Sequence, residues 1–358
     1  MKFLHESIAS KFVIHFTIAF FLVINTLSSY SQKTGCTDLK ANNYNAAASK
    51  NNGTCTYNTT TYAPPIKVRS ISKLLNESSG LQMVGNYLWS CNDGGGAAAI
   101  YRIDTATDAL LQTVNLEDAT NVDWEEISFD GTYFYVGDFG NNVNGARTDL
   151  KIYKFALNDV AEYVTNPVVT IPKEKIEVIS FRYSNQLLPE VSATNNTKYD
   201  CEAMIIDRGK IHLFSKNWIN VNTTHYVINS TAAGSYIADS VETLATDFLV
   251  TGAGKARGQQ IIVFIGYFPK APGKHFMQIL SDYSGGSYFN GNKRKLNLPD
   301  ALSMGQAEGI TFRNGSYGYI SNERLAAGPF TINQKLRSFD IRNYVTISSK
   351  RSRTSASK

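Results

Sequence analysis

Short runs of apolar residues, separated by turns that contain glycine, recur along most of the chain. In the most regular example, Ile127 and Phe129 alternate with polar residues, as in a strand with one buried face. Asp130 and Gly131 follow as a hairpin turn, because glycine adopts positive φ without a steric penalty. The next run, 133–136, is apolar on both faces, which predicts a second strand that is covered on two sides.

The same order of strand, turn and strand occurs five times. The copies begin near residues 78, 123, 200, 247 and 306, and further strands are expected at 99–103, 150–155, 176–183, 224–228 and 336–341. Repeats of three or four antiparallel strands every ~40–50 residues predict an all-β fold, a β-propeller. Five copies predict five blades, and the long interval 155–200 leaves room for a sixth. The segment 67–75 is expected to pair with the last blade and close the ring.

The first 31 residues are typical of a signal peptide. Lys2 and Lys11 precede an apolar stretch over 12–27, and small residues stand before Gln32. An uncleaved membrane anchor is the alternative, but the apolar stretch is shorter than the about 20 residues that a span needs. We therefore expect export, to the medium, the periplasm or the cell surface, and no transmembrane segment in the mature chain.

The four cysteines divide into two pairs. Cys36 and Cys55 lie in a small module, 32–62, and an exported chain should join them in a disulfide worth about 3 kcal/mol. Cys91 and Cys201 lie in different copies, so they are either buried thiols or a disulfide between blades. The expected domains are the signal peptide (1–31), the disulfide module (32–62), the propeller (63–346) and a basic, disordered tail (347–358).

Composition narrows the function classes. Aromatic residues make up 12% and charged residues 18% of the chain, and 26 glycines punctuate it, which suits an all-β protein. The net charge of +5 is scattered and not interleaved with aromatic residues, so nucleic acid is not an expected partner. The motifs of zinc proteases, of α/β-hydrolases and of redox dithiols do not occur. A ligand or protein partner of unknown identity and a monomeric chain are the remaining expectations.

The hairpins should gather acids at one end of the ring, because a hairpin returns the chain to the end at which it started. The residues placed there are Asn92, Asp93, Asp123, Glu125, Glu126, Asp138, Asp200, Glu202, Glu308, Asn322 and Glu323. Carboxylates this close cannot all stay ionised without a cation, basic partners or raised pKa values. Two interpretations remain open. The acids hold calcium, which prefers oxygen ligands, or they bond backbone amides of neighbouring blades and hold the ring together.

Several of these motifs resemble a known group of proteins. Ser79-Gly80-Leu81, the Asp-Trp-Glu-Glu-Ile sequence at 123–127 and Glu308-Gly309-Ile310 are similar to bacterial propeller families described as phytase-like or esterase-like, and to the related SdiA-regulated proteins. The resemblance covers most of residues 70–345 and implies the propeller fold. The likeness to phytases implies calcium at the channel mouth, with four matching acids: Glu126, Asp138, Glu202 and Glu308.

The chain departs from that group at two places. The fourth copy has Thr251-Gly252 where an acid would stand, and only Lys216, Arg147 and Arg324 are available near the expected rim to bind phosphate. Segment 35–57 resembles a short Gly-Cys-Thr-Asp … Asn-Tyr-Asn … Gly-Thr-Cys module of secreted bacterial proteins. We therefore expect an exported propeller that binds a ligand or partner with calcium at its mouth. The alternative is a metal-dependent hydrolase of phosphate or carboxylic esters, with unassigned catalytic residues.

Overall fold

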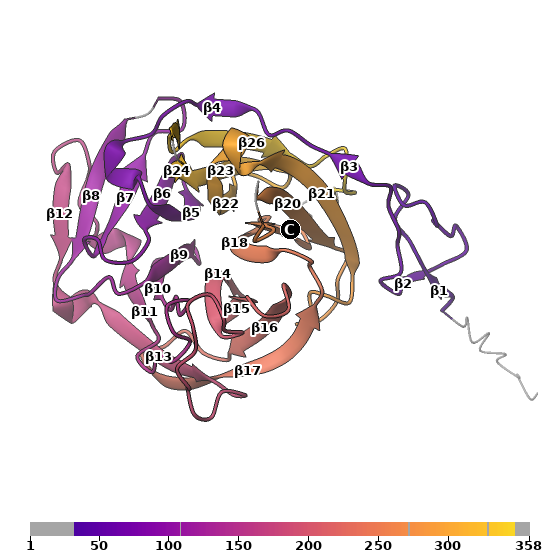
Figure 1. The fold of residues 1–358 in the computed structure, drawn as a ribbon, viewed down its shortest axis with the longest axis horizontal. Helices are drawn as coiled ribbons and strands as arrows, with labels where there is room; N and C mark the ends of the chain where they lie inside the picture. The colour runs from indigo at the N-terminus through magenta and orange to yellow at the C-terminus, as the bar shows by residue number, and fades with distance from the viewer. Residues whose placement is uncertain (1–31, 108, 271–272, 328, 348–358) are drawn as a thin grey trace, which may run out of the picture. The chain divides into compact units, whose positions relative to one another are not determined.

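The computed structural model describes residues 32–107, 109–270, 273–327 and 329–347. The expected signal peptide and nearly all of the basic tail lie outside these residues. Five inner strands surround a central channel (Figure 1), and each contacts the next around the ring, the last contacting the first. They are β5 (Ser78–Val84), β9 (Trp124–Phe129), β14 (Asp200–Asp207), β18 (Leu249–Lys255) and β22 (Gln306–Phe312). The predicted all-β propeller is confirmed, with five blades in the described part of the chain.

Each inner strand begins an antiparallel sheet that runs outward (Figure 1). The outer strands of the first two blades are β6 (Tyr87–Asn92), β7 (Ala99–Ile103), β8 (Leu110–Leu116), β10 (Tyr133–Asp138), β11 (Lys151–Ala156) and β13 (Glu177–Tyr183). Those of the last three are β15 (Lys210–Lys216), β16 (Thr223–Ile228), β17 (Gly234–Leu244), β19 (Ile261–Tyr267), β20 (Lys274–Ser281), β21 (Asn292–Asp300), β23 (Tyr317–Glu323) and β26 (Leu336–Asp340). The turn at Gly131 has a φ of 109°, as the hairpin prediction required.

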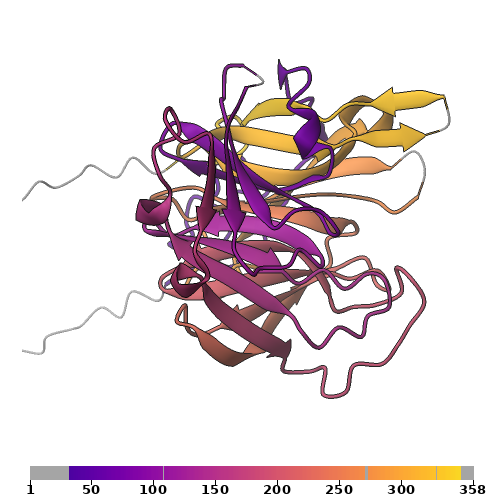
Figure 2. The same ribbon diagram turned by 90° about the vertical axis from the view of Figure 1, so that its left-hand side faces the viewer.

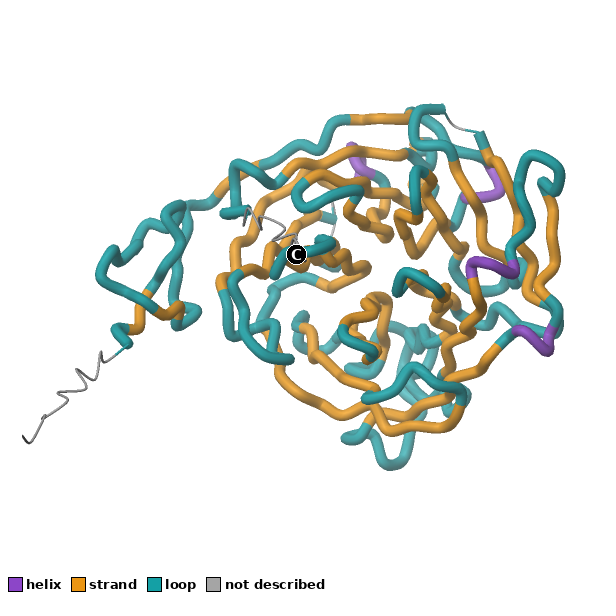
Figure 3. The backbone as a smooth tube through the Cα atoms, turned by 180° about the vertical axis from the view of Figure 1, so that it is seen from behind, coloured by secondary structure: helices purple, strands orange, loops and turns teal. Residues whose placement is uncertain are grey.

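Helices are short and few among the described residues (Figure 3). They are the 3-10 turns η1 (Lys73–Leu75), η2 (Leu157–Asp159) and η3 (Lys173–Lys175), and the single-turn helix α1 (Ala301–Met304). None of the helices in these segments has the length and apolar character to cross a bilayer. A further hairpin, β24 (Leu325–Ala327) with β25 (Phe330–Ile332), projects from the last blade.

The ring is closed by a strand from the start of the propeller. Strand β4 (Ile66–Val68) pairs antiparallel with β26, which confirms the predicted closure for the first part of 67–75; residues 73–75 form η1 instead. The interval 155–200 contributes the outermost strands of the first two blades rather than a sixth blade. Strand β12 (Val168–Ile171) pairs parallel with β8, and β13 pairs parallel with the first half of β17, whose second half pairs with β16. The second and third blades therefore share one continuous sheet.

Apolar side chains fill the spaces between neighbouring blades. Trp89 of the first blade packs on Phe134 of the second, with ring centroids 4.9 Å apart, and Phe214 packs on Phe264 between the third and fourth at 4.7 Å. All four are buried, and burial of each such side chain contributes about 2–3 kcal/mol. These second strands are covered on both faces, as the two-sided apolar pattern predicted.

Every inner strand carries an irregularity of register near its start. In β9, Trp124 pairs with Asp138 and Glu126 with Gly137, so Glu125 is left unpaired. The corresponding interruptions in the other four strands fall at Ser79–Gly80, Glu202, Thr251 and Glu308–Gly309. A β-bulge of this kind turns the extra side chain out of the ladder. The five bulges occupy equivalent places around one end of the channel.

The N-terminal module begins with β1 (Thr34–Gly35), which pairs with β2 (Lys50–Asn51). The predicted Cys36–Cys55 disulfide is present, with Cα atoms 4.9 Å apart, whereas Cys91 and Cys201 are free and buried. Strand β3 (Thr60–Thr61) already belongs to the edge of the fourth blade, where it pairs with β21.

Candidate metal and ligand site at the channel mouth

One end of the channel opens into a cavity of about 210 Å³, which we call the mouth. It is formed where inner strands begin and second strands end, as the hairpin argument predicted. Its walls are Asp93, Glu125, Asn142, Asn195, Glu202, Lys216, Trp218, Tyr267, Gln306, Glu308 and Glu323. Five of these residues are acids, and Lys216 is the one basic residue among them.

The bulges supply the central acids of the mouth. Glu125, Glu202 and Glu308 come from three blades and are 3%, 4% and 3% exposed. The equivalent residues in the other two blades are Ser79 and Thr251, so the acids do not form a complete ring. Ser79 donates to the main-chain oxygen of Glu125 at 2.7 Å.

Two groups of three carboxylates are close enough to hold a metal ion. Asp93, Asp123 and Glu125 form one group, and Glu125, Asp200 and Glu202 form the other; in each, one oxygen per residue lies within 4.8 Å of the others. Oxygens around Ca²⁺ lie 2.3–2.6 Å from the ion, so the ligands of one ion are at most about 5 Å apart. Both groups therefore fit a divalent cation, and Glu125 is shared between them.

Gly140 makes this close approach possible. A Cβ atom at this position would lie 2.2 Å from Glu125 Oε1 and 2.4 Å from Asp123 Oδ2. Only glycine leaves room for both carboxylates beside the loop that follows β10. The main-chain oxygen of Gly140 is not free for a cation, because it accepts from Arg147 at 2.8 Å.

Two carboxylate oxygens in the mouth have no hydrogen-bond partner among the described residues. They are Oε2 of Glu202 and Oε2 of Glu308, both of which are buried. The other oxygens of these groups accept from Lys216 and, at 2.8 Å, from Gln306. Leaving a buried acceptor unsatisfied costs about 1–3 kcal/mol. These two oxygens are therefore where a cation or a donor group of a ligand would be stabilised most.

The acids of the mouth raise one another's pKa values. Burial, together with the charges of Asp93 and Asp200, raises the pKa of Asp123 to about 7. Burial raises the pKa of Glu308 to about 6, and burial plus neighbouring carboxylates raise the pKa values of Glu125 and Glu323 well above the ordinary range. Near neutral pH and without a cation, part of this cluster carries protons.

Lys216 is the buried counter-charge of the mouth, and it is only 2% exposed. Burial lowers its pKa, but the paired Glu202 carboxylate, acting with Tyr267, Glu308 and Asp200, outweighs burial and raises the pKa well above the ordinary value. Its ammonium also lies 4.8 Å from the ring centre of Trp218 and 5.4 Å from that of Tyr267. The Trp218 indole in turn donates to Asp200 Oδ2 at 2.7 Å. The position of Lys216 is therefore fixed from several sides.

Glu126 does not line the mouth. Its carboxylate accepts from the amides of Ile127 at 3.0 Å and Ala253 at 3.3 Å, and the amides of Leu81 and Met204 also act to lower its pKa. These amides belong to four of the five inner strands, β9, β18, β5 and β14. Glu126 thus occupies the channel below the mouth and connects the blades, which matches the second of the two interpretations left open by the sequence.

Asp138 is also outside the mouth. Its carboxylate accepts from the amide of Asp123 at 3.1 Å and forms ion pairs with Arg147 at 2.8 Å and Lys151 at 3.4 Å. Of the four acids predicted to bind metal, the structure thus brings Glu202 and Glu308 together at the mouth and separates Glu126 and Asp138 from them. The hairpin aligns the backbones of Glu125, Glu126 and Asp138 as expected, but the bulge directs only Glu125 to the mouth.

The sequence contained a signal for this distinction. At the position after the bulge, the other four copies have Gly80, Ala203, Gly252 and Gly309, whereas the second copy has Glu126. A single long side chain fits in the channel because its four counterparts are small. Asp123, Glu125 and Asp200 were gathered by the hairpin argument but were not among the four predicted ligands. Of the basic residues expected near the rim, Lys216 lines the mouth, and Arg147 and Arg324 do not.

A second cavity, of about 490 Å³, adjoins the mouth; we call it the apolar cavity. It shares Trp218, Tyr267 and Gln306 with the mouth. Its other walls are Phe268, Pro269, Lys270, Gly273, His275, Ala301, Leu302 and Leu325.

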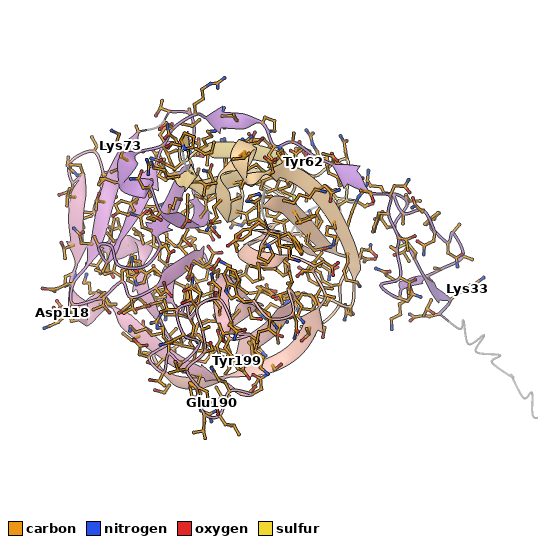
Figure 4. The ribbon with its side chains drawn as sticks, viewed as in Figure 1. Lys33, Tyr62, Lys73, Asp118, Glu190 and Tyr199 are labelled. Carbon is orange, nitrogen blue, oxygen red and sulfur yellow. A yellow bond between two sulfur atoms is a disulfide. The ribbon has the colours of Figure 1, made fainter. Side chains whose placement is uncertain are left out.

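Across the mouth from the apolar cavity, two loops form a raised rim. They are the loop 184–199 and the loop that follows β10. In the loop 184–199, Asn195 donates its amide to Asn142 at 2.8 Å and Ser192 donates to Asn144 at 2.8 Å, which joins this loop to the one after β10. Figure 2 shows this loop and the β24–β25 hairpin projecting from the same face. In Figure 4, Glu190 lies at the outer edge of the loop and Tyr199 lies nearer the channel.

A scan of family models and a search of curated proteins gave no match to this sequence. Among solved structures, the chain is similar to a PQQ-bound aldose sugar dehydrogenase from Streptomyces coelicolor, with a TM-score of 0.44, 12% identity, and coverage of 78% of this chain and 99% of that chain. It is also similar to an exo-β-1,3-galactanase from Phanerochaete chrysosporium, with a TM-score of 0.45, 9% identity, and coverage of 82% and 66%.

Proposed function

We propose that this propeller binds a divalent cation, calcium by preference, at its mouth and uses that cation to hold a ligand. The observation that carries the proposal is the pair of carboxylate groups that share Glu125. The unsatisfied oxygens of Glu202 and Glu308 support it independently. The available ligand atoms are carboxylate and amide oxygens, which hard cations prefer, and no cysteine lines the mouth.

A hydrolase is the second candidate, and one feature favours it. The side-chain amide nitrogen of Gln306 lies 2.8 Å from Glu308 Oε1 and 3.2 Å from Glu323 Oε2, so these two oxygens are at most about 6 Å apart. Two carboxyl groups that close, one with a pKa raised to about 6 by burial, suit general acid and base chemistry. Phosphate esters are the less suitable substrates, because Lys216 is the single basic residue lining the mouth.

The proposal is tested by titrating the mature chain with calcium in a calorimeter, with magnesium in parallel. Glu125→Gln removes one charge from both carboxylate groups and should weaken calcium binding at least tenfold, which is about 1.4 kcal/mol. Glu126→Gln is the matched control, since it changes the adjacent residue of the same strand, and it should leave the affinity within about twofold.

The proposal fails if the wild-type chain binds no calcium. It also fails if Glu126→Gln abolishes binding while Glu125→Gln does not, because the cation would then lie in the channel and not at the mouth. For the second candidate, turnover of a panel of neutral chromogenic esters and glycosides by the wild type, lost in Glu308→Gln, is the expected result. Turnover that survives this substitution would place hydrolysis elsewhere.

A further inference from the structure

The apolar cavity and the mouth adjoin each other and give the candidate site two chemically different halves. They meet at Trp218 and Tyr267, whose rings border both, and at Gln306. Carboxylates dominate the mouth, whereas the other half is walled by Phe268, Leu302 and further apolar side chains. A volume of about 490 Å³ is within the range of small-molecule sites, about 300–1,000 Å³. A ligand held by the mouth therefore has a place for an apolar group directly beside it.

The sequence of the fourth blade accounts for the change from acidic to apolar lining residues between the mouth and the apolar cavity. Its bulge residue is Thr251, which donates to the main-chain oxygen of Ala307 at 2.8 Å and adds no charge to the mouth. Its second strand, β19, ends at Tyr267, and Phe268 follows. One of the two copies that lack the acid thus supplies Tyr267, one of the two rings at the border between the halves.

Charge limits the part of the ligand that enters the mouth. The five acids of its wall, with Asp123 and Asp200, make seven carboxylates around the single ammonium of Lys216. Even with two divalent cations bound, this set carries a net charge of −2 when every acid is ionised. A phosphate or carboxylate head would add like charge to a buried site, where such charge is costly. The head that fits best is uncharged.

The hydrogen-bonding groups of the mouth further restrict the chemistry of the ligand head, the part of the ligand that enters the mouth. Ionised carboxylates only accept hydrogen bonds, and Glu202 Oε2 and Glu308 Oε2 lack donors among the described residues. Hydroxyl groups donate to carboxylates and also coordinate calcium through oxygen. Asn142, Asn195 and Gln306 add amides that both donate and accept. Several hydroxyls on one compact ring meet all of these requirements within about 210 Å³.

We infer that the ligand is a neutral glycoside with an apolar aglycone. Its sugar ring occupies the mouth against the cation and the acids, and its aglycone occupies the apolar cavity beside Trp218, Tyr267 and Leu302. This inference rests on the proposed cation site, because the cation holds the sugar hydroxyls.

The test uses calcium-loaded protein and a set of related probes in calorimetry. The glycoside probes are phenyl β-D-glucoside, phenyl β-D-galactoside and phenyl β-D-xyloside, and the partial probes are glucose, benzyl alcohol and phenyl phosphate. At least one phenyl glycoside should bind ten or more times more tightly than every partial probe, and chelation of calcium should weaken that binding at least tenfold.

A variant of the cavity gives an independent readout. Leu302 lines the apolar cavity and its side chain is 52% exposed, so Leu302→Asn should fold normally. It should weaken the phenyl glycoside about fivefold and leave calcium binding unchanged. Leu39→Asn is the matched control, because Leu39 is an exposed leucine of the N-terminal module, outside both halves of the site, and it should alter neither.

The outcomes separate this inference from the proposed function. If calcium binds but none of the phenyl glycosides does, the inference is wrong and the cation site stands. Tighter binding of phenyl phosphate than of the glycosides would overturn it in favour of an anionic head. Equal binding of benzyl alcohol would overturn it in favour of a purely apolar ligand. If calcium itself does not bind, the proposed function fails first.

Discussion

Glu125 and Glu126 are adjacent in β9, and both are almost fully buried, yet they belong to two different regions. Glu125 faces other carboxylates at the mouth, where burial and like charge raise its pKa. Glu126 faces backbone amides in the channel, where burial still raises its pKa well above the ordinary range and the amides only partly oppose that rise. The comparison shows that residue type and burial do not determine the role of a buried acid. Its neighbours do, because they decide whether an incoming cation or the protein itself compensates the charge.

The largest expected effect concerns Glu126. Glu126→Ala removes the acceptor of the Ile127 and Ala253 amides and leaves these buried donors unpaired, so we expect the free energy of unfolding to fall by about 4 kcal/mol. Glu125→Ala relieves repulsion in the mouth and should cost less than about 1 kcal/mol in the presence of a chelator. Urea unfolding of both variants measures the difference. Equal losses would mean that the two regions are not distinct.

The second prediction uses pH to separate the mouth from the rest of the fold. The folded pKa values of Asp123 and Glu308, about 7 and about 6, lie above those of the unfolded chain. The native state therefore binds more protons than the unfolded chain between about pH 4 and 7. The free energy of unfolding that these two acids contribute is lost as pH rises through this window. Bound calcium should abolish this loss, because it compensates the ionised acids.

The buried histidines oppose this trend. His212 Nδ1 lies 2.9 Å from His225 Nε2, and burial lowers the pKa of His212 to about 4. The neutral His212 ring contributes up to about 3 kcal/mol to the free energy of unfolding above the unfolded pKa of about 6.5. This contribution is lost as pH falls toward 4. Urea unfolding from pH 4.5 to 8, with calcium and with a chelator, should give curves that differ on the alkaline side only. If the curves with calcium and with a chelator coincide at every pH, Asp123 and Glu308 do not belong to the cation site.

Arg147 is paired with Asp138 outside the mouth, and its charge also acts on Asp123 at the mouth. Its substitution therefore tests both regions. Arg147→Met leaves buried Asp138 with Lys151 alone and should lower the free energy of unfolding by about 2 kcal/mol. The Arg147 charge, which lowers the pKa of Asp123, repels a divalent cation held by Asp123 more strongly than it repels a proton, so calcium binding at pH 7 should strengthen severalfold. Unfolding and calcium titration of the same variant check both effects. Unchanged calcium affinity would show that Asp123 is not a ligand.

The smallest expected effect is the pH dependence of calcium binding itself. Cations compete with protons for Asp123 and Glu308, so affinity should rise up to about tenfold, or 1.4 kcal/mol, between pH 6 and 7 and level off above pH 8. Calorimetry in buffers of different ionisation enthalpy should show protons released on binding at pH 6.5. A pH-independent affinity would exclude these two acids from the cation site.

Much of this architecture followed from the sequence. Alternating apolar residues and turns such as Asp130-Gly131 specified the hairpins, and the hairpins specified which end of the ring collects acids. The individual ligands did not follow, because a bulge shifts the side-chain alternation by one residue and hydrophobic periodicity does not reveal it. The hairpins therefore predicted both Glu125 and Glu126 at the mouth, and the resemblance to phytases favoured Glu126 as the metal ligand. The apolar cavity was also missed, since its walls come from separate segments around β19, α1 and β24.

The position of Glu126 also gives the mouth a floor. The Glu126 carboxylate, which accepts from β9 and β18 and lies among amides of the inner strands, blocks passage along the axis of the ring just below Glu125. Whatever enters the mouth must leave by the same opening, so a long polymer cannot thread through the protein. Such a polymer could present only its terminal unit, and recognition would then be limited to chain ends and small molecules.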